Sequence, residues 1–387
     1  GSYGKSGQTF TSAYLAHGLM NIMDKSFFGK TGITTDKPVS PYLTWEKTRQ
    51  YDLGLDMDMF NYRLNVKLDY YYKYTSSLIY DIPIPGSLYA FGAQVENAME
   101  ISNEGLELEL QADILRESAV SWRMKFNMAR NWNRFEKSYS GKDVVDGDGT
   151  LLVVGRPLNG LYVWAHRGYY NSDAEVPRLY KIDGQEIYFN GVATNGISGA
   201  VGDYRLLDLD GDGNPDSYYA GSPLPLAHGG WVNELMWKNF DLNVLVNFTI
   251  GRKMINNRMG LGFSRQSEDG HLTKLFDYRK LRPWDGVNKK PNAPAWGNSL
   301  SMNTDSAIEK VHHLALKQIT LGYNLPDRIS KKAGLSGVRF FLTAENLFYL
   351  SNYSGGNPEV VNIYTGRDNG DTYPLPRKYT LGLTLNF

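Results

Sequence analysis

Apolar and polar residues alternate with a period of two along much of this chain, a pattern typical of β-strands whose two faces meet different surroundings. In the segment 63–74, for example, Leu64 and Leu68 share one face, whereas Lys67 and Asp69 share the other. The same alternation predicts nine strands, at about residues 46–59, 62–79, 99–115, 120–135, 229–238, 240–253, 311–324, 338–350 and 378–387.

These predicted strands differ from those of a soluble β-sandwich, which is the main alternative because its strands also alternate. They run for roughly 10–18 residues, whereas strands of globular proteins average about five or six. Their polar faces are densely charged, which suits a water-filled lumen, and their apolar faces carry Tyr and Trp towards the ends. We therefore expect an all-β chain that forms part of a transmembrane antiparallel β-barrel.

Short and long connections alternate between the predicted strands, which gives each strand a direction. Tight turns are expected at 60–62, 116–119 and 238–239, and long segments at about 6–45, 80–98, 136–228, 254–310 and 351–377. Outer-membrane barrels have short periplasmic turns and longer extracellular loops. The long segments should therefore lie outside the cell, with only the turn at 325–337 long for its side. A parity change within 311–324 predicts a bulge near Lys317-Gln318.

Composition narrows the possible classes of protein. Lys plus Arg and Asp plus Glu both number 41, so the charge balance gives no basic surface for nucleic acid. Cys is absent, which excludes disulfide scaffolds and cysteine metal sites. No apolar run approaches the roughly 18 residues of a transmembrane helix. Nine strands also break the even-number rule of bacterial barrels, so we expect a fragment of a larger barrel.

A series of short motifs runs through nearly the whole chain. The segments are SYGKSGQ at 2–8, LTWEKT at 43–48, YYYK at 70–73, NEGLEL at 103–108, GRPLNGLY at 155–162, LKQITLGYNLP at 316–326, AENLF at 344–348 and YPLPR at 373–377. In order and spacing they resemble the SusC/RagA-like TonB-dependent transporters of the Gram-negative outer membrane. The sequence Val311-His312-His313 departs from the family's usual pattern at the start of its strand.

The resemblance implies both an architecture and a function. Residues 1–387 would be the C-terminal portion of a barrel of about 22 strands, with the nine strands as its last and the plug domain outside this chain. The protein would import a bulky nutrient, an oligosaccharide or a peptide, energised through TonB and helped by a SusD/RagB-like surface lipoprotein. A passive porin and a surface glycan-binding β-protein are the alternatives. No catalytic constellation favours an enzyme.

One acidic segment resembles the front of an EF-hand calcium loop, in which oxygen ligands alternate around a glycine turn. The candidate Ca²⁺ ligands are Asp208, Asp210, Asp212, Asn214 and Asp216. Tyr219 takes the twelfth position, where such loops usually carry Glu, so a further ligand would have to come from elsewhere. The alternative is a solvated acidic turn.

Two other groups of residues are candidates for function. Four aromatic residues of the largest loop could stack on sugar rings or peptide side chains, with internal loop contacts as the alternative; they are Tyr162, Trp164, Tyr169 and Tyr170. An outward apolar stripe ends the chain and resembles the signal read by the barrel-assembly machinery; it consists of Tyr379, Leu381, Leu383, Leu385 and Phe387. This last strand should pair with 338–350 on one side and with the first strand of the barrel on the other.

Overall fold

The computed structural model describes the chain apart from several short ranges. The residues outside the description are 10–19, 28, 36–37, 39, 86–91, 117, 146–150, 177, 181–185, 189–200, 212–215, 258–281, 288–289, 296–303 and 371. The chain divides into two compact units. The first unit comprises Gly1–Leu158 with Gly229–Leu235, and the second comprises Asn159–His228 with Met236–Phe387.

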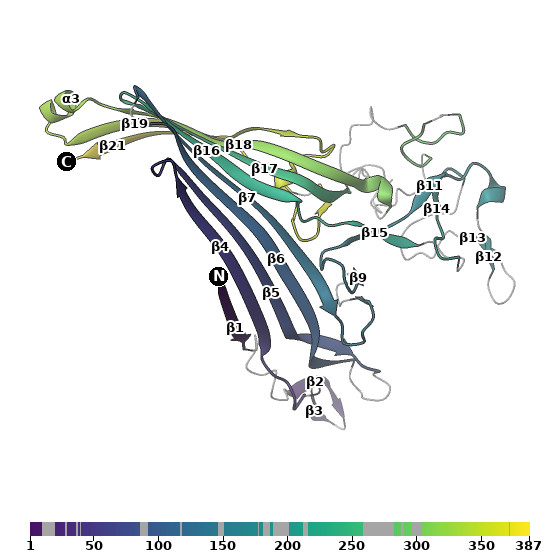
Figure 1. Ribbon diagram of the computed structural model, residues 1–387. Helices are drawn as coiled ribbons and strands as arrows, with labels where there is room; N and C mark the ends of the chain where they lie inside the picture. The colour runs from purple at the N-terminus through teal and green to yellow at the C-terminus, as the bar shows by residue number, and fades with distance from the viewer. Residues whose placement is uncertain are drawn as a thin grey trace. The chain divides into compact units, whose positions relative to one another are not determined.

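The first unit is built on long antiparallel strands that are hydrogen-bonded in the order of the sequence (Figure 1). They are β1 (Ser2–Gln8), β4 (Glu46–Met59), β5 (Leu64–Pro83), β6 (Ala93–Leu115) and β7 (Val120–Lys137). Side chains of β7 also hold the middle of β16 (Ala227–Trp237): Trp122 Nε1 donates to Asn233 Oδ1 at 3.1 Å, and Lys125 Nζ lies 2.8 Å from Glu234 Oε1. The hairpins β2 (Met20–Phe27) with β3 (Lys30–Thr35) and β8 (Val144–Val145) with β9 (Leu151–Leu152) form separate small sheets.

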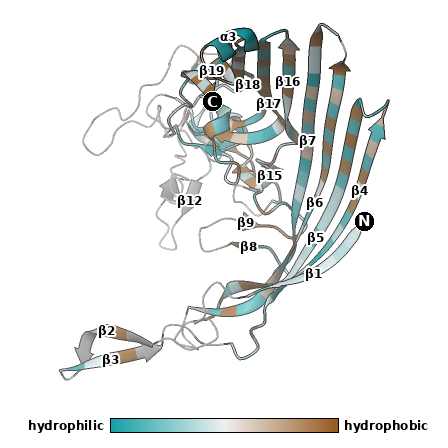
Figure 2. Ribbon diagram, turned by 90° about the vertical axis from the view of Figure 1, so that its left-hand side faces the viewer, coloured by the Kyte–Doolittle hydropathy of each residue, from teal (hydrophilic) through white to brown (hydrophobic). Residues whose placement is uncertain are grey.

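Strand register in the first unit aligns like with like across the sheet. Leu55 pairs with Leu68, Leu68 with Leu108, and Leu108 with Met128, so an apolar row crosses four strands. The next row is charged, because Lys67 pairs with Asp56 on one side and with Glu109 on the other. Figure 2 shows the resulting alternation of brown and teal along these strands. Leu55 remains 49% exposed, which a lipid environment explains and a water-facing surface does not.

The second unit repeats this arrangement. Its antiparallel strands are β17 (Phe240–Asn256), β18 (Ile308–Asn324), β19 (Gly337–Ser351) and β21 (Lys378–Asn386). Leu242, Leu321, Leu342 and Leu381 pair in succession and form a second apolar row, in which all but the half-buried Leu242 are exposed. Within the long connections lie β10 (Leu161–Trp164), β11 (His166–Tyr169), β12 (Arg178–Tyr180), β13 (Glu186–Tyr188), β14 (Tyr204–Leu206), β15 (Ser217–Gly221), β20 (Arg367–Asp368), and the 3-10 helices η1 (Asp173–Glu175), η3 (Asp305–Ala307) and η4 (Pro358–Val360).

The nine predicted strands are all present, most of them with slightly wider bounds, but the number nine is wrong. β1 is a further strand of seven residues, paired with β4 from Ser2↔Asp52 to Gln8↔Glu46. Its sequence is polar and carries no apolar alternation, so the periodicity did not reveal it. The predicted turn at 325–337 is long because it contains helix α3 (Asp327–Lys332). The total number of strands in the whole barrel stays a prediction.

The predicted bulge in β18 is confirmed at Lys317. On one side Leu316 pairs with Val246 and Gln318 with Leu245, so Lys317 has no partner there. On the other side Leu316 pairs with Phe348 and Gln318 with Glu345, so the bulged residue faces the two unpaired residues Asn346 and Leu347. The extra residues restore the apolar face on both sides of the irregularity.

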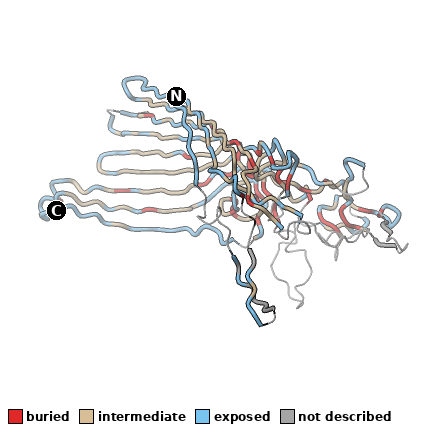
Figure 3. Tube along the Cα trace, turned by 90° about the horizontal axis from the view of Figure 1, so that it is seen from below, coloured by how far each residue is buried: buried red, intermediate tan, exposed pale blue. Residues whose placement is uncertain are grey.

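Buried residues gather at the strand ends that carry the long connections, as the red segments in Figure 3 show. In the first unit they form a cluster of Met99, Phe135, Val144 and Leu152. In the second unit one cluster contains Met254, Val311, Tyr353 and Val361 and another contains Leu161, Val163 and Ile255. No helix in the described part of the chain is long and apolar enough to cross a membrane.

Candidate functional site

The acidic segment between β14 and β15 brings three of the predicted calcium ligands together. Carboxylate oxygens of Asp208, Asp210 and Asp216 lie within 4.8 Å of one another. The other two predicted ligands, Asp212 and Asn214, lie outside the described residues. A tight turn produces this convergence: Asp216 Oδ2 accepts the Asp210 amide at 3.1 Å, and Asp208 Oδ1 accepts the Gly211 amide at 2.6 Å. Three hard oxygen donors on one short turn suit Ca²⁺, and its binding stays a prediction.

Tyr219, at the position where an EF-hand loop carries its bidentate acid, is committed to strand pairing instead. It lies in β15 opposite Tyr162 of β10, and the two ring centroids are 5.7 Å apart. The acidic turn therefore ends in a small sheet, and a chelating acid at this position would face the Tyr162 ring. A bidentate acid in the role of position twelve therefore has to come from a different segment.

The four predicted aromatic contacts are arranged mainly for internal packing. Tyr162 and Trp164 lie in β10, and Tyr169 in β11 stacks on Tyr204 with ring centroids 5.3 Å apart. Tyr170 is only 4% exposed. Burial raises the pKa of Tyr169 and also that of Tyr170, as expected for phenols withdrawn from water. Their role in substrate binding stays a prediction.

Asp305 and Ser306 of η3, just before β18, hold this loop region through a polar network that no sequence pattern predicted. Asp305 accepts a hydrogen bond from Tyr218 Oη at 3.2 Å and pairs with Nδ1 of His166. Ser306 Oγ donates to Tyr204 Oη at 3.0 Å. His166 and Asp305 are 139 residues apart in sequence, so no local motif marks the pair.

The segment 352–377, between β19 and β21, folds against the C-terminal part of β17 and the N-terminal part of β18. We call it the internal connection. It covers the face opposite the apolar row, because Val311, His313 and Ala315 are buried whereas Leu314, on the other parity, is 42% exposed. The cover provided by the internal connection explains why alternate residues of β18 are buried. The sequence of the segment itself did not predict this position.

Arg252 of β17 is the main polar anchor of the internal connection. Its guanidinium donates to the carbonyl oxygens of Pro358, Val361 and Asn362 at 3.2, 2.9 and 2.8 Å. The side chain is only 6% exposed, so these hydrogen bonds compensate for much of its lost hydration. At the far end of the segment, Tyr353 Oη donates to Asp368 Oδ2 at 2.8 Å.

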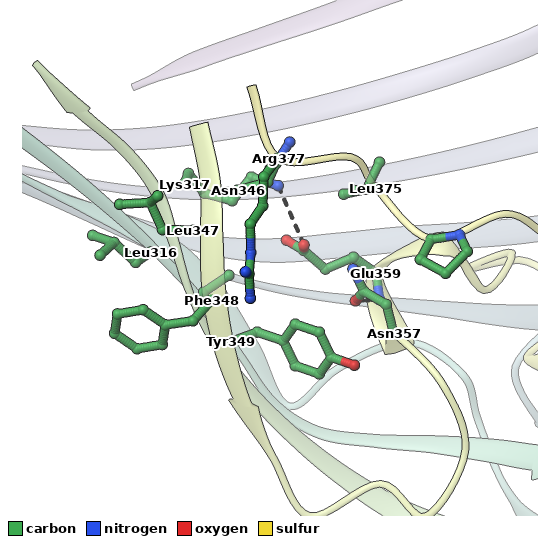
Figure 4. A pocket seen from close by; sticks show the side chains of 12 residues that line it. Leu316, Lys317, Asn346, Leu347, Phe348, Tyr349, Asn357, Glu359, Leu375 and Arg377 are labelled. Carbon is green, nitrogen blue, oxygen red and sulfur yellow. Dashed lines mark hydrogen bonds and ion pairs between the residues drawn. The ribbon is translucent and has the colours of Figure 1, made fainter. Parts of the chain in front are cut away.

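A pocket with a volume of 230 Å³ lies between the internal connection and the bulged part of β18 and β19. Lys317 Nζ lies 3.2 Å from Glu359 Oε2 across this pocket, and Arg377 extends beside Glu359 towards Phe348 and Tyr349 (Figure 4). The bulge creates the space, because Asn346 takes a left-handed conformation with φ of 52° and its side chain donates to Pro376 O at 3.2 Å. The change of parity within residues 311–324 predicted the bulge, but no sequence pattern predicted the pocket.

The C-terminal strand has the predicted neighbour. β21 pairs with β19 from Glu345↔Lys378 to Gly337↔Asn386. Its stripe is exposed throughout, with exposed fractions between 43% at Leu385 and 93% at Phe387. The described residues supply no strand for its other edge, so closure by the first strand of the barrel stays a prediction, as does the assembly signal.

Comparisons with known proteins agree with this architecture. The family model "TonB dependent receptor-like, beta-barrel" matches residues 1–219. TonB-dependent receptor P26 of Formosa agariphila is 30% identical over 100% of this chain and 39% of its own length. TonB-dependent receptor SusC of Bacteroides thetaiotaomicron is 27% identical over 93% of this chain and 34% of its own length. The solved RagAB peptide transporter has a similar fold, with a TM-score of 0.77 and 23% identity over 100% of this chain and 40% of that chain. The chain thus spans about two fifths or less of these proteins.

Proposed function

The chain belongs to the TonB-dependent receptor-like β-barrel family, and from this premise we propose that it forms the C-terminal part of an outer-membrane transporter that imports a bulky nutrient. Members of this family are outer-membrane β-barrel proteins, so the described strands belong to a barrel wall. The family consists of receptors and transporters rather than enzymes.

The observation that carries the proposal is the two-sided chemistry of the strands in each unit. Exposed apolar residues in register, such as Leu321, Leu342 and Leu381, suit contact with lipid. The opposite face is polar and, in the second unit, holds the internal connection with its charged pocket. A soluble glycan-binding protein has no use for the apolar rows, and a passive porin is disfavoured by the family match.

The imported nutrient is an oligosaccharide or a peptide, uptake is energised through TonB, and a SusD/RagB-like lipoprotein covers the extracellular side. The family match supports the TonB dependence. The similarity to SusC and to a structure described as a peptide transporter supports a bulky substrate, which in this chain would pass along the polar face. Ca²⁺ at the acidic turn between β14 and β15 would fix an extracellular loop next to that path.

Uptake by whole cells tests this proposal. A strain that lacks the full-length gene should lose accumulation of labelled oligosaccharide or peptide fractions, and the restored gene should recover it. A strain without functional TonB should lose the same accumulation, whereas uptake of a small sugar should continue in all strains. Uptake that persists without TonB would indicate a passive porin, and unchanged uptake without the gene would reject a role in import of the tested nutrients.

A further inference from the structure

The charges that line the pocket of the internal connection do not cancel. Lys317 pairs with Glu359, and His313 Nε2 lies 4.0 Å from the same carboxylate oxygen. Arg377, which shares the pocket, forms no ion pair within the described residues. The Arg377 guanidinium therefore has no acidic partner in the pocket lining, because Glu359, the single carboxylate there, pairs with Lys317.

Neighbouring charges do not supply the missing anion. Arg252 lies behind the turn that carries Glu359 and adds a buried positive charge, and its partners are carbonyl oxygens rather than acids. Glu345 is engaged with Lys378 at 3.7 Å, and Asp368 accepts the hydroxyl of Tyr353. The pocket lining, in which Lys317 and Arg377 face the single carboxylate of Glu359, thus carries one net positive charge, which favours an anionic ligand.

The pocket also lies on the side of the strands where an imported molecule would pass. Ala315 and Tyr349 pair directly, and both lie on the face opposite the exposed Phe348 and Leu350. The internal connection covers part of this same polar face, so the pocket at its margin opens towards the side that would line the barrel interior. Tyr349 is 42% exposed and offers a ring against which a sugar or a side chain can stack.

We propose that this pocket is a subsite for a carboxylate group carried by the imported oligomer. The Arg377 guanidinium receives the carboxylate in a bidentate pair, Lys317 adds a second positive charge, and Tyr349 contacts the adjoining unit of the ligand. The inference rests on the proposed function, because it assigns a substrate preference to the import path. The carboxylate can belong to a uronic acid or to an acidic peptide, and the experiment separates these sources.

The experiment measures equilibrium binding to the purified full-length transporter in detergent at low salt. Four probes are used: a galacturonate hexamer, the neutral maltohexaose, a peptide of alternating Glu and Gly, and its Gln counterpart. Wild-type protein should bind one acidic probe at least about tenfold more tightly than its neutral counterpart, and salt should reduce this preference. The acidic probe that binds identifies the source of the carboxylate.

Three variants test the assignment to this pocket. Arg377→Gln should remove most of the acidic preference, whereas Glu359→Gln should strengthen the preference because it frees Lys317. Lys332→Gln removes an equal charge from the exposed helix α3 and should behave like the wild type. Heat-modifiable migration checks that each variant is folded.

Two results would overturn the subsite: a wild type without acidic preference, or an Arg377→Gln protein that keeps it. TonB-dependent uptake, measured separately in cells, shows whether the proposed import function survives either result.

Discussion

The substitution Leu381→Arg tests the barrel reading most directly. Leu381 lies one residue from the middle of the nine-residue strand β21 and is 81% exposed. At about 3.4 Å per residue along a tilted strand, Leu381 lies within roughly 3 Å of the membrane midplane when β21 is centred in the bilayer. Its neighbour in the apolar row is Leu342, itself 49% exposed, so the paired residue of β19 offers no polar group to the guanidinium.

The expected cost follows from that position. An Arg on the lipid face near the midplane destabilises a barrel by roughly 2–4 kcal/mol, which lowers the ratio of folded to unfolded protein by a factor of roughly 30 to 700. Thr380→Arg, one residue away on the polar face, should cost less than about 1 kcal/mol because that face meets water. The two substituted side chains point to opposite faces of β21 but lie at nearly the same depth in the membrane.

The assay is denaturant unfolding of the full-length protein in lipid vesicles, followed by heat-modifiable migration on gels. Leu381→Arg should shift the midpoint to clearly lower denaturant, and Thr380→Arg should stay close to the wild type. Equal shifts in the two variants would refute the argument, because the two faces of β21 would then have equivalent surroundings. A larger shift for Thr380→Arg would mean that the faces have been assigned the wrong way round.

Three further predictions rest on local geometry. Calcium should raise the melting temperature of the full-length protein, and Asp210→Asn should reduce that shift. A melting temperature that neither calcium nor a chelator changes would show that the segment is a solvated acidic turn. Gly382→Val should destabilise by about 1–3 kcal/mol, because a Cβ there would lie 2.0 Å from Cζ of Phe341, whereas Gly4→Val, with open space around it, should change unfolding by less than about 0.5 kcal/mol. Arg252→Met should release the internal connection, which limited proteolysis would detect as faster cleavage within 352–377; cleavage at the wild-type rate would show that the apolar cluster alone holds it.

The membrane-spanning strands could be predicted because lipid on one side and water on the other force a period of two on the sequence. The parity change in β18 even located the bulge at Lys317. β1 was missed because its residues are polar and its place depends on pairing with β4 rather than on a pattern of its own.

The candidate sites divide in the same way. The acidic turn was visible because its carboxylates are close in sequence, and three of them do converge. The pocket was not visible, since one of its walls is the internal connection. Arg252 anchors that segment through carbonyl oxygens more than 100 residues away, and backbone acceptors leave no trace in the sequence. The link between His166 and Asp305 was hidden for a related reason, because each partner alone is an ordinary loop residue.

The bulge at Lys317 also limits how this barrel can change its length during evolution. A single inserted residue in a strand turns every following side chain to the opposite face, so lipid would meet the charged row. In β18 the additional residue is tolerated because Asn346 and Leu347 lie unpaired across from it and the ladder resumes in register. Single-residue insertions and deletions in related sequences should therefore occur in such compensated bulges or in the long connections, and be rare elsewhere in the strands.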